Sequence, residues 1–177
     1  MSTDTITACG AVAAPPAVVY AIIANYREHH PNICPPRFFR NFVVEQGGTG
    51  AGTIVRFEAV VMGRGNVMRS EITEPEPGRV LAERDIERGM YTTFTVEPKD
   101  EGRTSEVTIT TRLPHRPGLV GGIASAVERA VSKRLLPPVY AEELERLAAY
   151  ATSDRAPHLG ANVATPVATP APITART

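Results

Sequence analysis

The sequence predicts an α+β domain in which a curved antiparallel sheet of about seven strands is covered by one long helix near the C-terminus. Two features carry this prediction. β-rich segments follow one another through the middle of the chain, separated only by short turns that contain glycine or proline, which is the pattern of an antiparallel meander. After them, residues 119–152 form the longest segment with helical periodicity, and one face of an antiparallel sheet needs such a cover.

Strands are expected where β-branched and aromatic residues alternate with polar ones between turn-forming residues. The first is predicted at residues 3–14, and the others at 38–45, 53–62, 66–73, 79–87, 90–98 and 103–113. Alternation places Val55 and Phe57 on one face of their strand, and Val107 and Ile109 on one face of the last strand. These faces are expected to point toward the core.

Two short helices are predicted after the first strand. Pro15 and Pro16 end that strand, and proline suits the first turn of a helix, so a buried helix is expected at residues 17–24. A second helical turn is expected at residues 25–30, ended by Pro31. Both elements are expected to close one end of the sheet.

The long helix carries two apolar stripes separated by Pro137 and Pro138. An interior proline lacks the backbone donor and clashes with the preceding turn, so a kink or a restart of the helix is predicted here. Beyond the prolines the apolar positions shift in phase, and the helix is expected to stand away from the sheet locally and leave a pocket. Arg134 lies within the first stripe and is a candidate polar group at the edge of that pocket.

Composition excludes several classes of function. The 19 Lys and Arg residues balance 19 Asp and Glu residues, whereas a nucleic-acid-binding protein usually carries a basic surplus. No apolar run approaches the ~20 residues that span a bilayer, and the N-terminus lacks the basic start of a signal peptide. We therefore expect no nucleic acid partner, no stable membrane insertion and a cytoplasmic location, with a monomer and a homodimer both open.

Neither a metal nor another cofactor is predicted. Cys9 and Cys34 are expected to be reduced thiols, in line with a reducing compartment. The cysteines and histidines show no metal-binding spacing, and the adjacent His29 and His30 have no evident third ligand nearby. These two histidines remain candidates for a general acid or base, with a surface or capping role as the alternative.

Residues 1–153 are predicted to form one domain, and residues 154–177 a disordered tail. The tail is rich in alanine, threonine and proline and has few large apolar residues, so it cannot bury enough surface to offset the loss of chain entropy. The glycine-dense segment 47–52 is interpreted as a hairpin turn, because a strand follows it rather than the lysine and helix of a phosphate loop.

The order of these elements resembles the helix-grip fold of the START-like superfamily, also called SRPBCC, and within it the branch of polyketide cyclase/dehydrase and lipid transport proteins. The resemblance covers residues 3–152 and is carried by segments 14–26, 47–52, 76–81, 92–96 and 144–147. It implies a deep apolar cavity between the curved sheet and the last helix. Members of the superfamily bind lipids, polyketides, hormones or other apolar molecules, and a minority catalyse cyclisation or dehydration. No catalytic motif is shared among them, so the resemblance assigns no catalytic residue.

The ligand-binding pocket is predicted to be lined by apolar residues of the sheet and the long helix, namely Phe57, Met68, Phe94, Ile109, Ile123 and Val127. Arg134 is expected at its edge, where it would make anionic ligands bind better than neutral ones; the alternatives are pairing with an acidic strand residue or exposure near the prolines. Side chains two residues apart on a strand share a face, so Arg84 should lie on the same face as the apolar Val80 and Ala82. This favours Arg84 over Glu83 as the inward-facing residue, unless a twist or bulge exposes both.

Binding or transport of an apolar small molecule, such as a lipid or a polyketide, is the function that these residues and the resemblance predict. One alternative is a polyketide cyclase or dehydratase that uses histidine, arginine or tyrosine groups of the cavity, with Tyr91 and Tyr140 as the candidate tyrosines. Another is a protein-interaction module. The sequence does not decide which ligand is bound or whether the protein is an enzyme.

Overall fold

The computed structural model describes residues 4–61, 63–114 and 119–158, and for residues 119–129 it describes the backbone only. The strands of this part of the chain are β1 Thr5–Val12, β2 Phe39–Gln46, β3 Ile54–Val61, β4 Arg64–Glu76, β5 Val80–Asp85, β6 Tyr91–Lys99 and β7 Thr104–Arg112. The helices are α1 Pro16–Ala24, α2 His30–Ile33, the 3-10 helix η1 Asp100–Gly102, and α3 Leu119–Ala151. The predicted helix-grip architecture is confirmed.

The strands form a single antiparallel sheet in the order β1-β7-β6-β5-β4-β3-β2. Every neighbouring pair except β1 and β7 is joined directly along the chain, as expected when short turns connect the strands. The register places Phe57 of β3 opposite Met68 of β4, and Phe94 of β6 opposite Ile109 of β7. Each pair therefore projects from adjacent strands on the concave face of the sheet.

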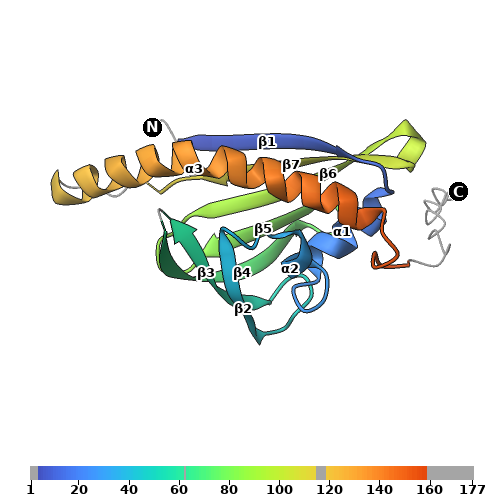
Figure 1. Cartoon of the computed structure of the whole chain (residues 1–177), viewed down its shortest axis with the longest axis horizontal. Helices are drawn as coiled ribbons and strands as arrows, with labels where there is room; N and C mark the ends of the chain where they lie inside the picture. Colours follow the sequence, from blue (N-terminus) through green and yellow to red (C-terminus); the bar gives the residue numbers. More distant parts are fainter. Residues whose placement is uncertain (1–3, 62, 115–118, 159–177) are drawn as a thin grey trace, which may run out of the picture.

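Helix α3 lies along the open face of the curved sheet and runs beside β1 (Figure 1). The two elements approach closely at Gly10, where an added Cβ would lie only 3.2 Å from Leu144 Cβ. Glycine in this strand therefore lets the helix settle against the sheet edge. Although α3 has 33 residues, no helix in the described part of the chain is long and apolar enough to cross a membrane.

A kink or a restart of the long helix was predicted at Pro137 and Pro138. The restart is wrong, because α3 continues through both prolines, and the kink stays a prediction. The prolines remove the backbone donors that would bond to the carbonyl groups of Lys133 and Arg134. All four of these residues are exposed, so solvent can bond to the freed carbonyl groups and the helix tolerates the loss. The second apolar stripe is buried as predicted, with Tyr140, Leu144, Leu147 and Ala151 all facing the protein.

The second short helix exists but begins where its end was expected. Residues 26–29 form turns, and α2 starts at His30 with Pro31 in its first turn. Proline is suited to this position because the first backbone donors of a helix have no partner within it. Pro31 therefore starts this helix and does not end it.

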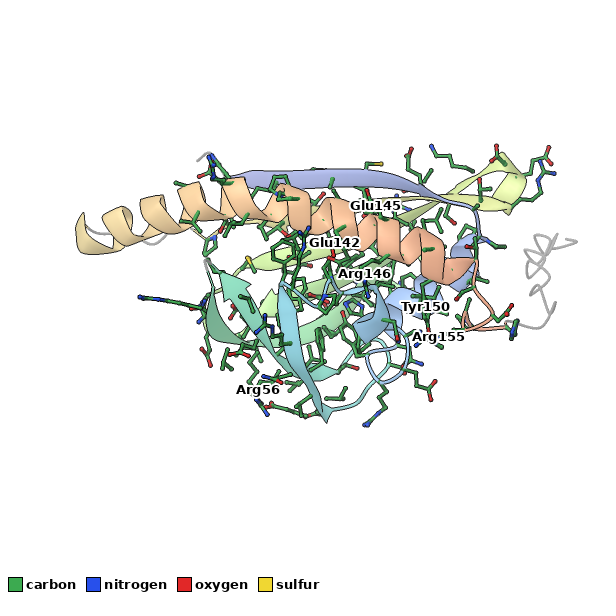
Figure 2. All side chains as sticks on the ribbon, in the orientation of Figure 1. Arg56, Glu142, Glu145, Arg146, Tyr150 and Arg155 are labelled. Carbon is green, nitrogen blue, oxygen red and sulfur yellow. The ribbon has the colours of Figure 1, made fainter. Side chains whose placement is uncertain are left out.

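The described part of the predicted tail, residues 154–158, packs against the domain. Ala156 is buried, and Arg155 donates to Asn32 Oδ1 at 2.5 Å while its guanidinium lies over the ring of Tyr150. Figure 2 shows Arg155 and Tyr150 together at the end of α3. The remainder of the predicted tail, residues 159–177, lies outside the described residues.

Two truncations test where the domain ends. A chain ending at His158 should keep its Tm within about 2 °C, because the composition of the removed segment cannot build a packed core. A chain ending at Thr152 also loses the burial of Ala156 and the contacts of Arg155, and its Tm should fall by roughly 3–6 °C. Differential scanning calorimetry measures both values. Equal Tm values for the two truncated chains would show that residues 153–158 contribute no stability.

Candidate functional site

A cavity of about 330 Å³ lies between the concave face of the sheet and α3. Residues of α2, α3 and strands β2 to β6 line it. This volume is near the lower end of the range for small-molecule pockets. The cavity therefore suits one compact ligand better than a lipid with two long chains.

Most of the cavity wall is apolar and rich in aromatic rings. Phe42 stacks on Phe57 with ring centroids 5.0 Å apart, and Phe39 meets the same ring edge-on at 5.7 Å. The other apolar lining residues are Ala59, Val61, Met68, Met90, Phe94, Val131 and Leu136. Strand alternation explains this wall, because side chains two residues apart on β3 and β4 point into the same space.

One end of the cavity is polar, and the imidazole of His30 lies at its centre. Its Nδ1 is 2.7 Å from the carbonyl oxygen of Ile23, which can only accept, so Nδ1 carries a proton. Its Nε2 is 3.6 Å from Oε1 of Glu83, and Tyr26 donates its hydroxyl to the same oxygen. Burial lowers the pKa of His30, although the nearby Glu83 acts in the opposite direction. The neutral ring is therefore favoured, with Nε2 free to accept.

Glu143 brings a second carboxyl group to this end from α3. It is 4 % exposed, and within the described part of the chain its carboxyl group makes no hydrogen bond or ion pair. Burial, reinforced by the charge of Glu83, raises the pKa of Glu143 to about 8. The carboxyl group thus keeps its proton at neutral pH and presents an unused polar group to the cavity.

Cys34 completes the polar end. Burial, followed by the charges of Glu143 and Glu83, raises the pKa of its thiol well above the usual range. His30, Cys34 and Glu143 each offer an atom able to bind a metal, and these atoms all lie within 4.8 Å of one another. The sequence-based expectation that no metal is needed stays a prediction.

Two hydroxyl groups on the cavity wall, those of Tyr140 and Thr92, are already engaged. Tyr140, one of the predicted tyrosines, lines the cavity and shares a hydrogen bond with Thr111, whose hydroxyl oxygen is 2.7 Å from that of Thr92. Burial raises the pKa of Tyr140. Tyr91 does not line the cavity. The hydroxyl groups of Tyr140, Thr111 and Thr92 bond to one another, so they are less available to a ligand than the carboxyl group of Glu143.

Three of the predicted lining residues, Phe57, Met68 and Phe94, do meet in the cavity wall. Ile109 is buried in the core but does not line the cavity. The side chains of Ile123 and Val127 lie outside the described residues. Ligand binding by any of these residues stays a prediction.

The inward placement predicted for Arg84 is wrong. Arg84 is exposed and donates to Glu71 Oε2 at 2.8 Å, while Glu83 points into the cavity. Val80 and Ala82, which set the predicted parity, lie with Arg84 on the face opposite Glu83, although Ala82 itself is fully buried. An arginine on this face keeps its hydration and gains an ion pair, which explains the choice of face.

Arg134 is also exposed and does not line the cavity, which agrees with the alternative of exposure near the prolines. The acidic residues Glu83, Asp85 and Glu143 line the cavity instead. Asp85 is engaged by its own turn, since it accepts from the backbone N–H of Arg88 at 2.8 Å. The expected preference for anionic ligands therefore loses its physical basis.

Glu143 and Cys34 were not among the predicted site residues, although the sequence held a signal for each. Glu143 lies three residues after Tyr140 and four before Leu147, inside the buried stripe of α3, where a carboxyl group is unusual. Cys34 follows His30 by four residues, which is one helical turn. What the sequence could not indicate is that Glu143 meets this pair from a distant segment.

Residues 4–152 match the sequence model of the family described as polyketide cyclase / dehydrase and lipid transport. A search of curated proteins found no match. Solved structures show the same fold. The KanY protein is 22% identical, with a TM-score of 0.69 over 86% of this chain and 100% of that chain.

Two other solved structures extend the likeness. An aromatase/cyclase from Streptomyces sp. R1128 is 19% identical, with a TM-score of 0.69 over 85% of this chain and 94% of that chain. A START superfamily protein from Mycobacterium smegmatis is 11% identical, with a TM-score of 0.60 over 81% of this chain and 96% of that chain. At these identities the likeness shows a shared fold and leaves the ligand open.

The buried carboxyl group of Glu143 should make stability depend on pH. Because its pKa rises from an ordinary value of 4.5 to about 8 on folding, the folded protein binds more protons than the unfolded chain between these values. Stability should therefore fall as pH rises through this window, by an amount on the order of a few kcal/mol. Urea unfolding of chelator-treated protein at several pH values measures this fall.

Glu143→Gln removes the titration and keeps the shape of the side chain, so its stability should fall less between pH 5 and 8, a window of about three units. Glu142→Gln is the matched control, since Glu142 is partly exposed and pairs with Arg37. Subtracting the variant curve from that of the natural protein isolates Glu143 from His30, whose lowered pKa acts at the acidic side. Parallel curves would contradict the assigned shift.

Proposed function

Because the chain belongs to the polyketide cyclase/dehydrase and lipid transport family, we propose that it binds a compact apolar small molecule between α3 and the sheet. The observation that carries this proposal is the aromatic wall around a cavity of about 330 Å³. A dry core would close this space, since protein interiors pack to high density. An apolar cavity with a few convergent polar groups is the usual form of a ligand site.

The polar end suggests what the ligand carries. Glu143 and Glu83 place two carboxyl groups beside the imidazole of His30, and the arginine that lines the cavity, Arg88, is bonded to Val67 O and Asp85. An anionic group on the ligand would meet negative charge there without a free cation to offset it. A neutral hydroxyl or carbonyl group, by contrast, can exchange hydrogen bonds with these side chains. We infer that neutral polar groups are preferred.

Filling the cavity tests the proposed site. Ala59→Phe projects a ring into the cavity and should weaken the binding of Nile red, a neutral apolar dye, by at least about tenfold, which corresponds to ~1.4 kcal/mol. Val67→Phe is the matched control, because Val67 is 52 % exposed and does not line the cavity. Its affinity should stay within about twofold of the natural protein. Equal affinities in both variants would place the dye elsewhere.

A matched ligand pair tests the preference at the polar end. We expect 2-naphthol to bind more tightly than 2-naphthoate by about tenfold or more at pH 7, because the ligand carboxylate would meet the negative charge of Glu83. Arg134→Met should leave this ratio unchanged, since Arg134 is exposed and lies outside the cavity lining. Isothermal titration calorimetry measures both affinities. Tighter binding of the naphthoate, lost in Arg134→Met, would reinstate the original expectation.

A second candidate function, catalysis of dehydration, is favoured by one observation. The Tyr26–Glu83–His30 contacts and the free carboxyl group of Glu143 place proton donors and acceptors together at one end of an apolar cavity. General acid–base catalysis needs such groups within hydrogen-bond reach of the substrate. Loss of water from a β-hydroxy ketone requires a base to take a proton from carbon and an acid to protonate the leaving hydroxyl group.

Ultraviolet absorbance follows this reaction, because the enone product absorbs where the β-hydroxy ketone does not. A catalyst should lose about a hundredfold in rate or more on Glu143→Gln or His30→Gln while its affinity for Nile red changes little. Glu142→Gln should keep the full rate. If the natural protein and Glu143→Gln convert the ketone equally slowly, binding alone remains as the function.

A further inference from the structure

We propose that the polar end of the cavity is a binding site for a transition metal ion of the Zn²⁺ class, held by His30, Cys34 and Glu143. The site goes beyond the proposed function, since binding of an apolar ligand needs no metal. His30 begins α2 and Cys34 follows the last residue of this helix, so the two lie about one helical turn apart. Glu143 comes from α3. The three side chains differ in chemistry, and together they offer nitrogen, sulfur and oxygen ligands.

The spacing of the three groups fits a single ion. Their ligand atoms lie within 4.8 Å of one another. Zn²⁺ binds nitrogen, oxygen and sulfur at roughly 2.0–2.3 Å, so ligand atoms of a tetrahedral site are about 3.5 Å apart. Side-chain rotations that move each atom by about an ångström would close the difference. All three residues are buried, at 2 %, 6 % and 4 % exposure for His30, Cys34 and Glu143.

His30 is already held as metal-binding histidines usually are. Its Nδ1–H donates to the carbonyl oxygen of Ile23 at 2.7 Å, and this bond fixes the tautomer in which Nε2 has a free lone pair. The ring is also stacked on Tyr26, with centroids 4.2 Å apart. Glu83, whose Oε1 lies 3.6 Å from Nε2 and accepts from Tyr26, adds a negative charge on the side of the ring where the ion would bind.

Glu143 supplies an independent reason to expect a ligand. Buried carboxyl groups normally have partners, and one without them calls for an explanation such as a bound ion. In the described part of the chain, Glu143 has neither a hydrogen bond nor an ion pair, and its side chain lines the cavity. A cation bound beside His30 and Cys34 would give this carboxyl group its missing partner.

The same face of α3 holds a further polar side chain, the partly buried Arg146. Arg146 lies one turn after Glu143, extends below the helix toward α2 and donates to the carbonyl oxygen of Asn32 (Figure 2). Its Nε is buried without a hydrogen-bond partner.

The ligand set selects among metals. A thiolate and an imidazole suit Zn²⁺ and Co²⁺, whereas Mg²⁺ and Ca²⁺ prefer oxygen ligands throughout. Three protein ligands leave a fourth position, and because the lining residues surround it, that position faces the cavity. A polar atom of a bound organic ligand can occupy it.

Cobalt provides the direct test, because its spectrum reports both the geometry and the presence of sulfur. Full-length protein is stripped with a chelator under reducing conditions and titrated with Co²⁺. We expect about one equivalent to bind, with a thiolate-to-cobalt charge-transfer band and the intense visible bands of a tetrahedral site. Absence of the charge-transfer band, or only the weak bands of an octahedral oxygen site, overturns the proposal.

Paired variants locate the site. Cys34→Ser should abolish the charge-transfer band, and Glu143→Gln should weaken Co²⁺ binding by about tenfold or more. The matched controls are Cys9→Ser, at an exposed cysteine of β1, and Glu142→Gln, beside Glu143 on α3; both should bind within about twofold of the natural protein. A band that survives in Cys34→Ser or disappears in Cys9→Ser overturns the assignment.

A measurement of Tm on the natural protein tests the proposal without relying on variants, which could fail to fold. Saturating Zn²⁺ should raise the Tm of chelator-treated protein, whereas Mg²⁺ should not, because an ion that binds only the folded state stabilises it by mass action. No rise with Zn²⁺ overturns the proposal without any substitution. Binding of Nile red to metal-free protein is measured separately, so failure of the metal site and failure of the apolar site are distinguishable.

Discussion

The close packing of α3 on β1 is the contact on which the rest of the structure depends. Gly10 has no side chain to hold the helix away, and Leu144 fills the space that a larger residue would take. This contact fixes both the height of the helix above the sheet and its rotation. Since Glu143 precedes Leu144, the same contact turns its carboxyl group toward the cavity, beside His30 and Cys34.

The apolar surroundings of the cavity disfavour ionised groups, yet its polar end contains side chains that are usually ionised in water. Aromatic rings of β2 and β3 exclude water from most of the wall, and burial shifts the pKa values of His30 and Glu143 toward their neutral forms. Glu83 is stabilised by Tyr26, whereas Glu143 has no such partner in the described residues. The carboxyl group of Glu143 can therefore still form hydrogen bonds or bind a cation at the polar end of the cavity.

Family membership explains the fold of this chain, whereas the geometry of its cavity suggests which ligands the fold can bind. The family and the solved structures account for a sheet wrapped around a helix, and the geometry of this chain shows the apolar cavity between them. The side chains at the polar end decide which ligand atoms can be met there. The three residues of the proposed metal site and the apolar wall border the same cavity, so the two proposals are compatible with each other.

The sequence by itself determined the sheet, the order of its elements and most inward faces, since strand alternation and turn residues act locally. Phe57, Met68 and Phe94 were placed correctly for this reason. The continuity of α3 through its prolines and the outward placement of Arg84 depended on solvent exposure, which local pattern does not reveal. The start of α2 was misplaced for another reason, since proline can either end a helix or occupy its first turn. Only the tertiary structure brought Glu143 to His30 and Cys34, because side chains from distant segments meet through the packing of whole elements.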